Sequence, residues 1–210
     1  MKQKKYVALS YFFLFTFLLG WMHWPFLSVH RYLTSYHSPA LDALMRTATH
    51  VGDGLFFCSV ILFVLIWISK KEALQLSLIF LLSSGMAQFL KRVIFPNALR
   101  PMAYFKGDPQ FHIIKNLDYH LTHSFPSGHS TSVFALASFI CLAYSKRISY
   151  DLLLLIAACF FAFTRIYLSQ HFLHDVVAGS LIGISSTLLI WKWTHLQWQA
   201  LDQPWLQKNR

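Results

Sequence analysis

The feature that most constrains the fold is a series of long apolar runs separated by short polar and basic segments. A helix needs about 20 apolar residues to cross the hydrocarbon core of a bilayer, and backbone polar groups in lipid must pair within the segment. We therefore predict an all-α, polytopic membrane protein with six transmembrane helices in a bundle. The six runs cover residues 6–24, 55–69, 73–90, 130–145, 151–168 and 176–193.

The composition agrees with this class of protein. Hydrophobic residues make up 56% of the 210 residues and charged residues only 12%, as is typical of membrane proteins. The net charge of +10 could indicate a nucleic-acid partner, but the cations cluster at the ends of apolar runs. All three cysteines fall inside apolar runs, which argues against disulfides and a zinc site. We expect one membrane-embedded domain over residues 1–210, bound to the lipid bilayer and not to nucleic acid.

The basic segments also predict the orientation, because cytoplasmic loops carry an excess of lysine and arginine. Such residues occur at 2–5, at 70–71, at 146–147 and in the C-terminal tail. With these segments inside, the N-terminus is cytoplasmic and the connections after the third and fifth runs lie on the opposite side. Since the chain is small, we expect a bacterial inner membrane, with any active site at the non-cytoplasmic interface, facing the periplasm or exterior.

Two shorter patterns refine this layout. Ser38 followed by Pro39 is typical of a helix start, so residues 38–46 form either a short amphipathic helix at the interface or a plain loop. In the sixth run, Gly179 and Gly183 form a small-xxx-small pattern, which lets two helices approach closely.

Ionisable residues lie between the fifth and sixth runs, at a depth where they are costly and usually functional. His171 and Asp175 are four residues apart, a spacing that brings two side chains together on one helix face. A carboxylate bonded to one imidazole nitrogen leaves the other nitrogen nucleophilic. Arg165 offers a planar fork of donors suited to phosphate oxygens. The alternative is a helix end with ordinary polar residues.

A second polar stretch precedes the fourth run. Pro126 and Gly128 are turn formers, and a helix is expected to begin at about His129. The hydroxyl of Ser127 and the open N–H of Gly128 would then lie at a helix N-terminus, which favours phosphate. A third stretch, at the end of the third run, adds the cations Lys91, Arg92 and Arg100.

Taken in order, these three stretches resemble the type 2 phosphatidic acid phosphatase superfamily, the membrane lipid-phosphate phosphatases related to vanadium haloperoxidases. The family pattern is a lysine, six residues and Arg-Pro; then Pro-Ser-Gly-His; then Ser-Arg, five residues, histidine, three residues and aspartate. The second block matches in full at residues 126–129. The third matches at Arg165, His171 and Asp175, with Thr164 in place of serine.

The first block departs from the family spacing. Arg100 and Pro101 match, but eight residues separate Lys91 from Arg100, and seven separate Arg92 from Arg100. Either Lys91 or Arg92 can therefore fill the role of the family lysine.

The resemblance implies a mechanism through a phosphohistidine. His171 would attack phosphorus and Asp175 would orient its ring. His129 would protonate the leaving oxygen and then act as base for the hydrolytic water. No metal or cofactor is expected, because protein groups would bind the non-bridging oxygens. These groups are Lys91 or Arg92, Arg100, Ser127, Gly128 and Arg165.

Several alternatives stay open from the residues. His120, His123 and His129, or His171 with His174, could hold a metal, although no carboxylate cluster accompanies them and His174 would also suit an interface. We expect a phosphatase acting on a membrane lipid phosphate or diphosphate. A phosphoryl or head-group transferase could use the same phosphohistidine, and a non-enzymatic lipid-binding or transport protein could use the same scaffold. The lipid and the oligomeric state are not specified by the sequence.

Overall fold

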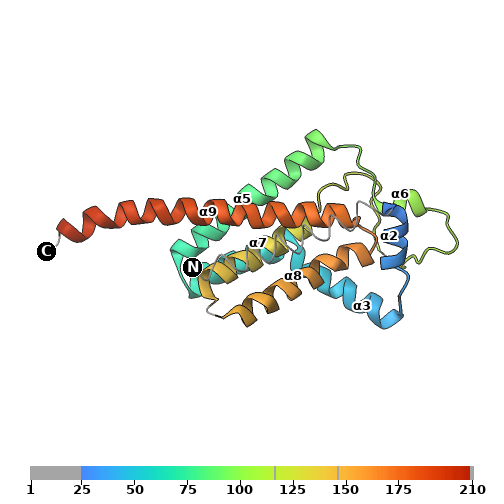
Figure 1. Ribbon diagram of the computed structural model, residues 1–210, viewed down its shortest axis with the longest axis horizontal. Helices are drawn as coiled ribbons and strands as arrows, with labels where there is room; N and C mark the ends of the chain where they lie inside the picture. Colours follow the sequence, from blue (N-terminus) through green and yellow to red (C-terminus); the bar gives the residue numbers. More distant parts are fainter. Residues whose placement is uncertain (1–24, 116, 146, 209–210) are drawn as a thin grey trace.

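The computed structural model describes residues 25–115, 117–145 and 147–208, with side chains as far as residue 198. Every regular element in these ranges is a helix, so the all-α prediction is confirmed there (Figure 1). The expected first span, residues 6–24, lies outside the described residues. The elements are α2 (Phe26–Leu33), α3 (Pro39–Ala48), η1 (Thr49–Gly52), α4 (Gly54–Trp67), α5 (Lys70–Phe89), η2 (Leu90–Ile94), α6 (Pro101–Phe105), α7 (Gly128–Tyr144), α8 (Ile148–Tyr167) and α9 (Leu173–Lys208).

Three of the described helices are long and apolar enough to cross a membrane: Lys70–Ile94, Ile148–Tyr167 and Leu173–Trp198. Two further helical pieces, Pro39–Gly52 and Gly54–Trp67, meet at a bend of 54° and are apolar and long enough only when taken together. α7 is apolar but has only 17 residues. The described part of the chain therefore contains three or four long spans, and it does not establish the expected count of six.

The run predicted at 55–69 differs from expectation in how it crosses. α4 has 14 residues and a length of about 21 Å at 1.5 Å per residue, less than the roughly 30 Å of a bilayer core. It is continued on its N-terminal side by η1 and α3. Residues 38–46, for which a loop and an interfacial helix were both open, form most of α3, and the Ser38 side chain accepts a hydrogen bond from the Leu41 N–H.

Helix α7 is central to the packing and contacts α5, α8 and α9. Its closest approach is to α9, where two glycines leave room for its backbone. A Cβ atom on Gly179 would lie 2.2 Å from the Ser127 carbonyl oxygen, and one on Gly183 would lie 2.3 Å from the Thr131 carbonyl oxygen. The small-xxx-small pattern therefore fixes the N-terminus of α7 against the first turns of α9.

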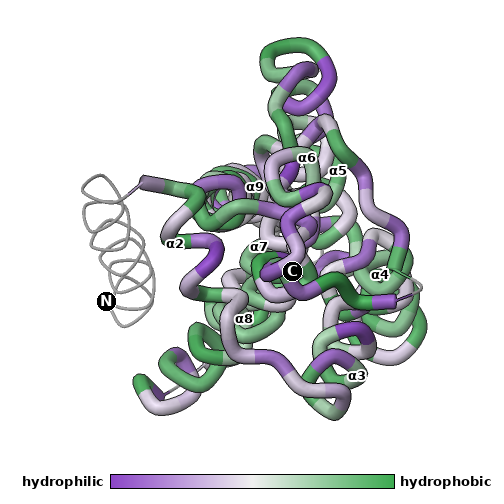
Figure 2. Tube along the Cα trace, turned by 90° about the vertical axis from the view of Figure 1, so that its right-hand side faces the viewer, coloured by the Kyte–Doolittle hydropathy of each residue, from purple (hydrophilic) through white to green (hydrophobic). Residues whose placement is uncertain are grey.

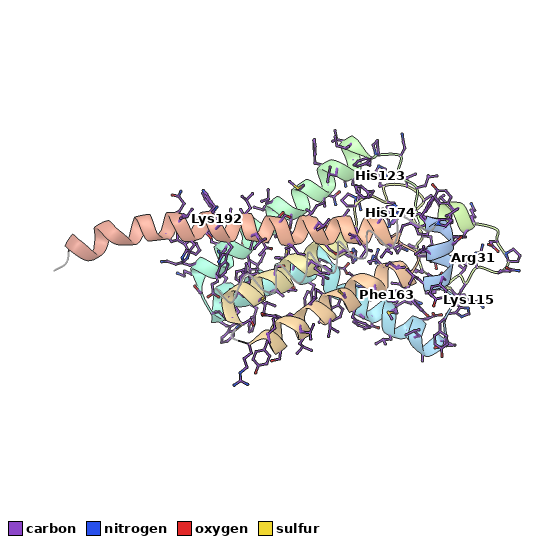
Figure 3. The ribbon with its side chains drawn as sticks, viewed as in Figure 1. Arg31, Lys115, His123, Phe163, His174 and Lys192 are labelled. Atoms are coloured by element: carbon purple, nitrogen blue, oxygen red, sulfur yellow. The ribbon has the colours of Figure 1, made fainter. Side chains whose placement is uncertain are left out.

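The polar segments gather at one end of the helices. α2, α6 and the connection before α7 lie at this end, whereas the α4–α5 and α7–α8 turns lie at the other (Figure 1). The labelled side chains of Arg31, His123 and His174 are also at this end, and Lys192 lies well along α9 (Figure 3). Hydrophobic residues dominate much of α4 and α8, as expected for lipid-facing helices (Figure 2). The three sequence motifs thus meet at one end.

Candidate active site

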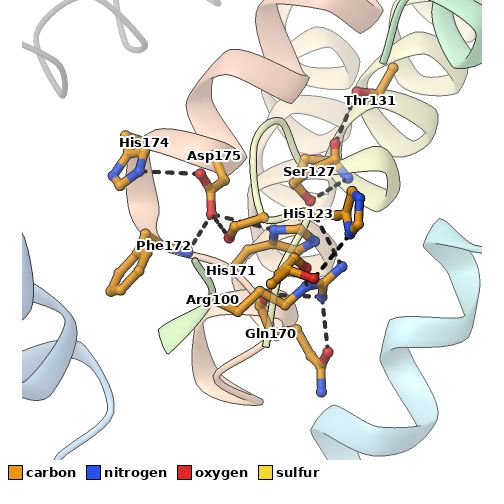
Figure 4. A network of polar contacts seen from close by, with 12 residues as sticks. Arg100, His123, Ser127, Thr131, Gln170, His171, Phe172, His174 and Asp175 are labelled. Atoms are coloured by element: carbon orange, nitrogen blue, oxygen red, sulfur yellow. Dashed lines mark hydrogen bonds and ion pairs between the residues drawn. The ribbon is translucent and has the colours of Figure 1, made fainter. Parts of the chain in front are cut away.

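The turn between α8 and α9 carries the predicted nucleophile. The N–H of His171 donates to the Arg165 carbonyl at 3.1 Å, so the end of α8 holds this turn. Ser169 in the turn has a φ of +52°, a conformation uncommon for a non-glycine residue. His171 lies two residues before α9 begins, and Asp175 lies in the first turn of α9. The His171 Nδ1 is 3.4 Å from the Asp175 Oδ2, so the predicted pair forms (Figure 4).

Two segments hold Asp175, one on each side of the helix start: the 124–127 stretch and Phe172. Its Oδ2 accepts hydrogen bonds from the Ser124 hydroxyl at 2.5 Å and from the Phe172 N–H at 2.9 Å. The Ser127 N–H donates to the Asp175 backbone carbonyl at 2.9 Å. These bonds fix the carboxylate beside the imidazole and join the second motif to the third.

His174 contacts the same carboxylate from the other side. Its Nε2 is 3.2 Å from the Asp175 Oδ1, and its ring stacks on Phe172 with centroids 5.4 Å apart. The expectation of a simple interfacial residue is therefore incomplete, because His174 also belongs to the polar network of Asp175.

Burial sets the protonation state of His171. Its side chain is 2% exposed, and this desolvation lowers the pKa of the imidazole well below its ordinary value. Asp175 opposes the shift, whereas the charges of Arg100 and Lys91 add to it. The imidazole is therefore neutral near pH 7. With its proton on Nδ1, facing Asp175, the lone pair on Nε2 is free for nucleophilic attack.

The N-terminus of α7 provides a binding site for an anion. Ser127 caps this helix, and its Oγ accepts hydrogen bonds from the Ser130 N–H at 3.4 Å and the Ser130 hydroxyl at 2.9 Å. The Ser127 hydroxyl proton remains available to a ligand. A Cβ atom on Gly128 would meet no atom within 4 Å, so open space lies beside the first residue of the helix. Unpaired N–H groups and the helix dipole favour a phosphate there.

The structure distinguishes the two candidates for the first-motif lysine. The charges of Arg100, Arg165 and Asp175 act on the Lys91 ammonium, which is partly buried among them. Arg92 is exposed, and its Nε donates to the Gln88 Oε1 at 3.2 Å. Lys91 therefore lies deeper among the charged groups of the site than Arg92, which is also near Lys91 and lines the same cavity.

Lys91 and Arg92 both lie in a π-helical turn. Residues 90–94 form η2, where the Phe95 N–H donates to the Leu90 carbonyl at 2.8 Å, five residues back. A π-turn holds more residues per turn than an α-helix and often occurs at functional sites. It lies within the segment that carries the two residues in excess of the family spacing.

Arg100 is buried and mostly engaged by oxygen atoms of the protein. Its Nη1 donates to the Gln170 carbonyl at 3.0 Å and to the Gln170 Oε1 at 3.1 Å, and its Nε donates to the Thr122 carbonyl at 3.0 Å. Its Nη2 also reaches the His123 carbonyl at 3.4 Å. Burial lowers the pKa of Arg100, and Asp175 opposes this shift. Arg100 thus joins two loops and leaves few N–H groups for a ligand.

Arg165 makes fewer hydrogen bonds to protein groups than Arg100. Its Nη1 donates to the Thr49 hydroxyl at 2.9 Å, while its Nε is buried without a hydrogen-bond partner among the described residues. An unpaired buried donor is costly, so a group that accepts from it would be bound favourably. Arg165 also lies near Lys91, Arg100 and Asp53.

The most important residue that the sequence interpretation missed is Asp53, at the bend between η1 and α4. Its Oδ1 lies 2.6 Å from the Nε2 of His129, and its Oδ2 lies 2.8 Å from the Nδ1 of His50. An acidic residue between two glycines, directly before an apolar run, was the available signal.

A polar cavity of about 580 Å³ opens beside the cations and is lined in part by Lys91, Arg92 and Arg100. His120 and His123 face this cavity. No group of three or more His, Cys, Asp or Glu side chains within the described ranges is arranged to hold a metal ion. The site as it stands is a cage of cations and N–H groups around two histidines, suited to phosphate chemistry.

Comparisons with known proteins point to the same chemistry. Residues 72–199 match the family model described as the PAP2 superfamily. The chain is 34% identical over 101 residues to a protein of Escherichia coli (strain K12) named "Putative undecaprenyl-diphosphatase YbjG", covering 45% of this chain and 48% of that protein. The chain thus matches about half the length of this relative.

Two solved structures have a similar fold. The crystal structure of Aquifex aeolicus LpxE aligns with a TM-score of 0.65 and 25% identity, covering 79% of this chain and 94% of the other. The transmembrane PAP2 type phosphatidylglycerolphosphate phosphatase from Bacillus subtilis aligns with a TM-score of 0.60 and 20% identity, covering 90% and 95%. The second likeness concerns the fold alone.

Proposed function

Because this chain belongs to the PAP2 superfamily, we propose that it is an integral-membrane phosphatase acting on a lipid phosphate or diphosphate. The observation that carries the proposal is the buried, neutral His171 paired with Asp175 beside the open N-terminus of α7. The proposal includes one membrane-embedded domain over residues 1–210, with six spans and the N-terminus in the cytoplasm. The membrane is a bacterial inner membrane, and the active site faces the periplasm or exterior.

The substrate phosphate binds at the N-terminus of α7. The Gly128 N–H and the Ser127 hydroxyl donate to its oxygens, and Lys91, Arg165 and the remaining donors of Arg100 neutralise its charge. The unpaired Nε of Arg165 and the open space beside Gly128 support this placement. Phosphoryl transfer depends mainly on positioning and charge stabilisation, which this arrangement supplies.

The reaction then proceeds in two steps. The Nε2 of His171 forms a bond to phosphorus while the bond to the leaving oxygen breaks, and His129 donates a proton to that oxygen. In the second step, a water attacks the phosphohistidine and gives its proton to His129. The N–P bond breaks, inorganic phosphate leaves, and both histidines return to their starting protonation states.

The lipid substrate is proposed from the named relative and from the shape of the site. The name of the Escherichia coli relative suggests a polyprenyl diphosphate. The basic cavity next to Lys91 could hold a second phosphoryl group, which favours a diphosphate. The same phosphohistidine would also allow transfer to an alcohol.

The test is release of inorganic phosphate by the purified protein in detergent, with excess chelator present. Undecaprenyl diphosphate, phosphatidylglycerol phosphate, phosphatidic acid and a lipid A phosphate are offered separately, and His171→Ala is the control. We expect release from at least one lipid by the wild type and none by the variant. Transfer of label to an alcohol without phosphate release would indicate a transferase. Lipid binding without turnover would indicate a binding protein, and rescue of activity by a divalent ion would contradict the protein-only cage.

A further inference from the structure

The side chain of Asp53 lies at the start of α4 but does not cap this helix. It occupies the N-cap position of α4, with φ −70° and ψ 145°, where an aspartate commonly accepts a hydrogen bond from its own helix. Here the side chain makes no such cap. The carboxylate is directed instead to two histidines, with its Oδ1 at 2.6 Å from the His129 Nε2 and its Oδ2 at 2.8 Å from the His50 Nδ1.

The neighbouring glycine makes this approach possible. A Cβ atom on Gly52 would lie 2.8 Å from the Cβ of His129 and 3.0 Å from its Cδ2. The backbone of η1 therefore packs directly against the imidazole of α7. The bend of 54° after Gly52 places the next residue, Asp53, at the edge of the same ring. Space for this contact, and not an unusual φ, is what requires glycine here.

If His129 is to act as a general acid, its imidazole needs a carboxylate neighbour, because its surroundings disfavour a positive charge. Burial of the imidazole is the largest effect that disfavours a positive charge on it, and the charges of Arg165 of α8 and Lys91 of η2 add to this effect. Asp53 provides the opposing negative charge, and His50 is the other ionisable group on this carboxylate. Without Asp53, a proton on His129 would face two cations with no nearby counter-ion.

We infer that Asp53 is a positioning residue for His129: it holds the Nε2 of the imidazole, turns the Nδ1 toward the leaving oxygen and stabilises the imidazolium. This inference rests on the proposed function, in which His129 is the general acid. The site then contains two histidine–carboxylate pairs. In one, Asp175 keeps a buried neutral nucleophile in place, and in the other Asp53 opposes the burial and the two cations that disfavour a proton on His129.

The first experiment compares Asp53→Asn with the wild type on two substrates. Phosphatidic acid has a poor alkoxide leaving group, whereas p-nitrophenyl phosphate has a weakly basic one that needs little protonation. We expect kcat on phosphatidic acid to fall about 10- to 100-fold, part of the 10²–10⁴ typical of general acid catalysis, with little change in KM. On p-nitrophenyl phosphate the loss should be under about threefold by the same argument.

The pH profile gives a second readout. The acid must be protonated, so activity is lost as pH rises through its pKa. Removing the carboxylate charge disfavours the imidazolium, so the alkaline limb of kcat for Asp53→Asn should move to lower pH by about one unit or more. Asp108→Asn is the matched control, because Asp108 is a carboxylate paired with Arg31 in a loop outside the site. Its rates and pH profile should equal those of the wild type.

A double-mutant cycle separates positioning from a structural role. If Asp53 acts through His129, adding Asp53→Asn to His129→Ala should cause no further loss of rate. Equal losses on both substrates, an unshifted pH profile and multiplicative effects in the cycle would overturn the inference. If Asp53→Asn does not fold, Gly52→Ala takes its place in the two-substrate comparison and in the double-mutant cycle, because the added methyl displaces His129 and keeps every charge. A wild type without phosphatase activity on any lipid would instead refute the proposed function.

Discussion

At the scale of single residues, the two histidines of the site differ most in their access to water. The side chain of His171 is 2% exposed and that of His129 is 26% exposed. A desolvated imidazole stays neutral and nucleophilic, whereas an imidazole near water can pass a proton to and from solvent. This difference, together with the separate carboxylate partners, supports different roles for the two residues.

The first prediction tests that division of roles. His171→Ala should abolish the phosphoenzyme and all turnover, because no other group can form the bond to phosphorus. His129→Ala should lower the rate about 10²- to 10⁴-fold on phosphatidic acid and much less on an aryl phosphate. The measurement is trapping of phosphohistidine with labelled substrate, run beside phosphate release. Trapped label on the His171 variant, or loss of label only in the His129 variant, would mean that the roles are exchanged.

Residue spacing predicted part of the site correctly and missed part of it. His171 meets Asp175 and Ser127 caps α7, because both arrangements are set within a few residues. Asp53 could not be assigned to His129, because their contact depends on a helix bend far from the motif. The sequence also left Lys91 and Arg92 as alternatives, since one extra residue in a helical turn rotates the side chains that follow it around the helix axis.

At the scale of elements, η2 carries both candidate cations, and we propose that Lys91 is the one that contacts the phosphate. We predict that Lys91→Ala lowers kcat/KM for phosphate release by about 10²-fold or more, since it removes a charge-assisted contact from a cage that stabilises the transition state. Arg92→Ala is the matched control, with the same change at the adjacent position. Its effect on a monophosphate should be under about threefold, the scale of an exposed charge. The assay is steady-state phosphate release in detergent, and a larger loss for Arg92→Ala would contradict the assignment.

The contact between α7 and α9 gives a second prediction at this scale. Gly179→Ala places a methyl group 2.2 Å from the Ser127 carbonyl, so the helices must separate. Overpacking of this kind costs about 1–3 kcal/mol, and the displacement should also move Ser127 away from Asp175 and reduce activity. Gly85→Ala in α5 is the control, because its methyl meets no atom within 4 Å and alanine favours a helix. Thermal unfolding in detergent should show a lower Tm for Gly179→Ala and no decrease for Gly85→Ala. An unchanged Tm in both would contradict the packing argument.

Hydropathy predicted the helical class and most helix positions, but it could not define how each run crosses the membrane. The 14-residue α4 depends on α3 and η1 to extend its path, and α7 reaches only 17 residues. Helix length is decided by where caps and bends occur, as at Ser127 and Asp53, and these depend on tertiary contacts. The helix-approach role of Gly179 and Gly183, by contrast, was readable from spacing and is confirmed.

At the scale of the whole molecule, the two ends of the helices differ in chemistry. One end holds α2, α6 and the connection before α7, and the other holds the α4–α5 and α7–α8 turns (Figure 1). Lysine and arginine usually lie on the cytoplasmic side, so the cations at the site end depart from this rule. The proposed phosphate binding would explain them. We therefore propose that the basic turns at the opposite end lie on the cytoplasmic side.

This asymmetry leads to a prediction of orientation. Cysteine is placed at Gln110, exposed in the loop near α6, or at Arg147, exposed at the start of α8, in a background without Cys58, Cys141 and Cys159. In intact cells an impermeant thiol reagent should label Gln110→Cys and not Arg147→Cys, because the first lies at the end that faces outward. Disrupted cells are the control, in which both positions should react. Labelling of Arg147→Cys alone in intact cells would reverse the orientation and place the phosphatase site in the cytoplasm.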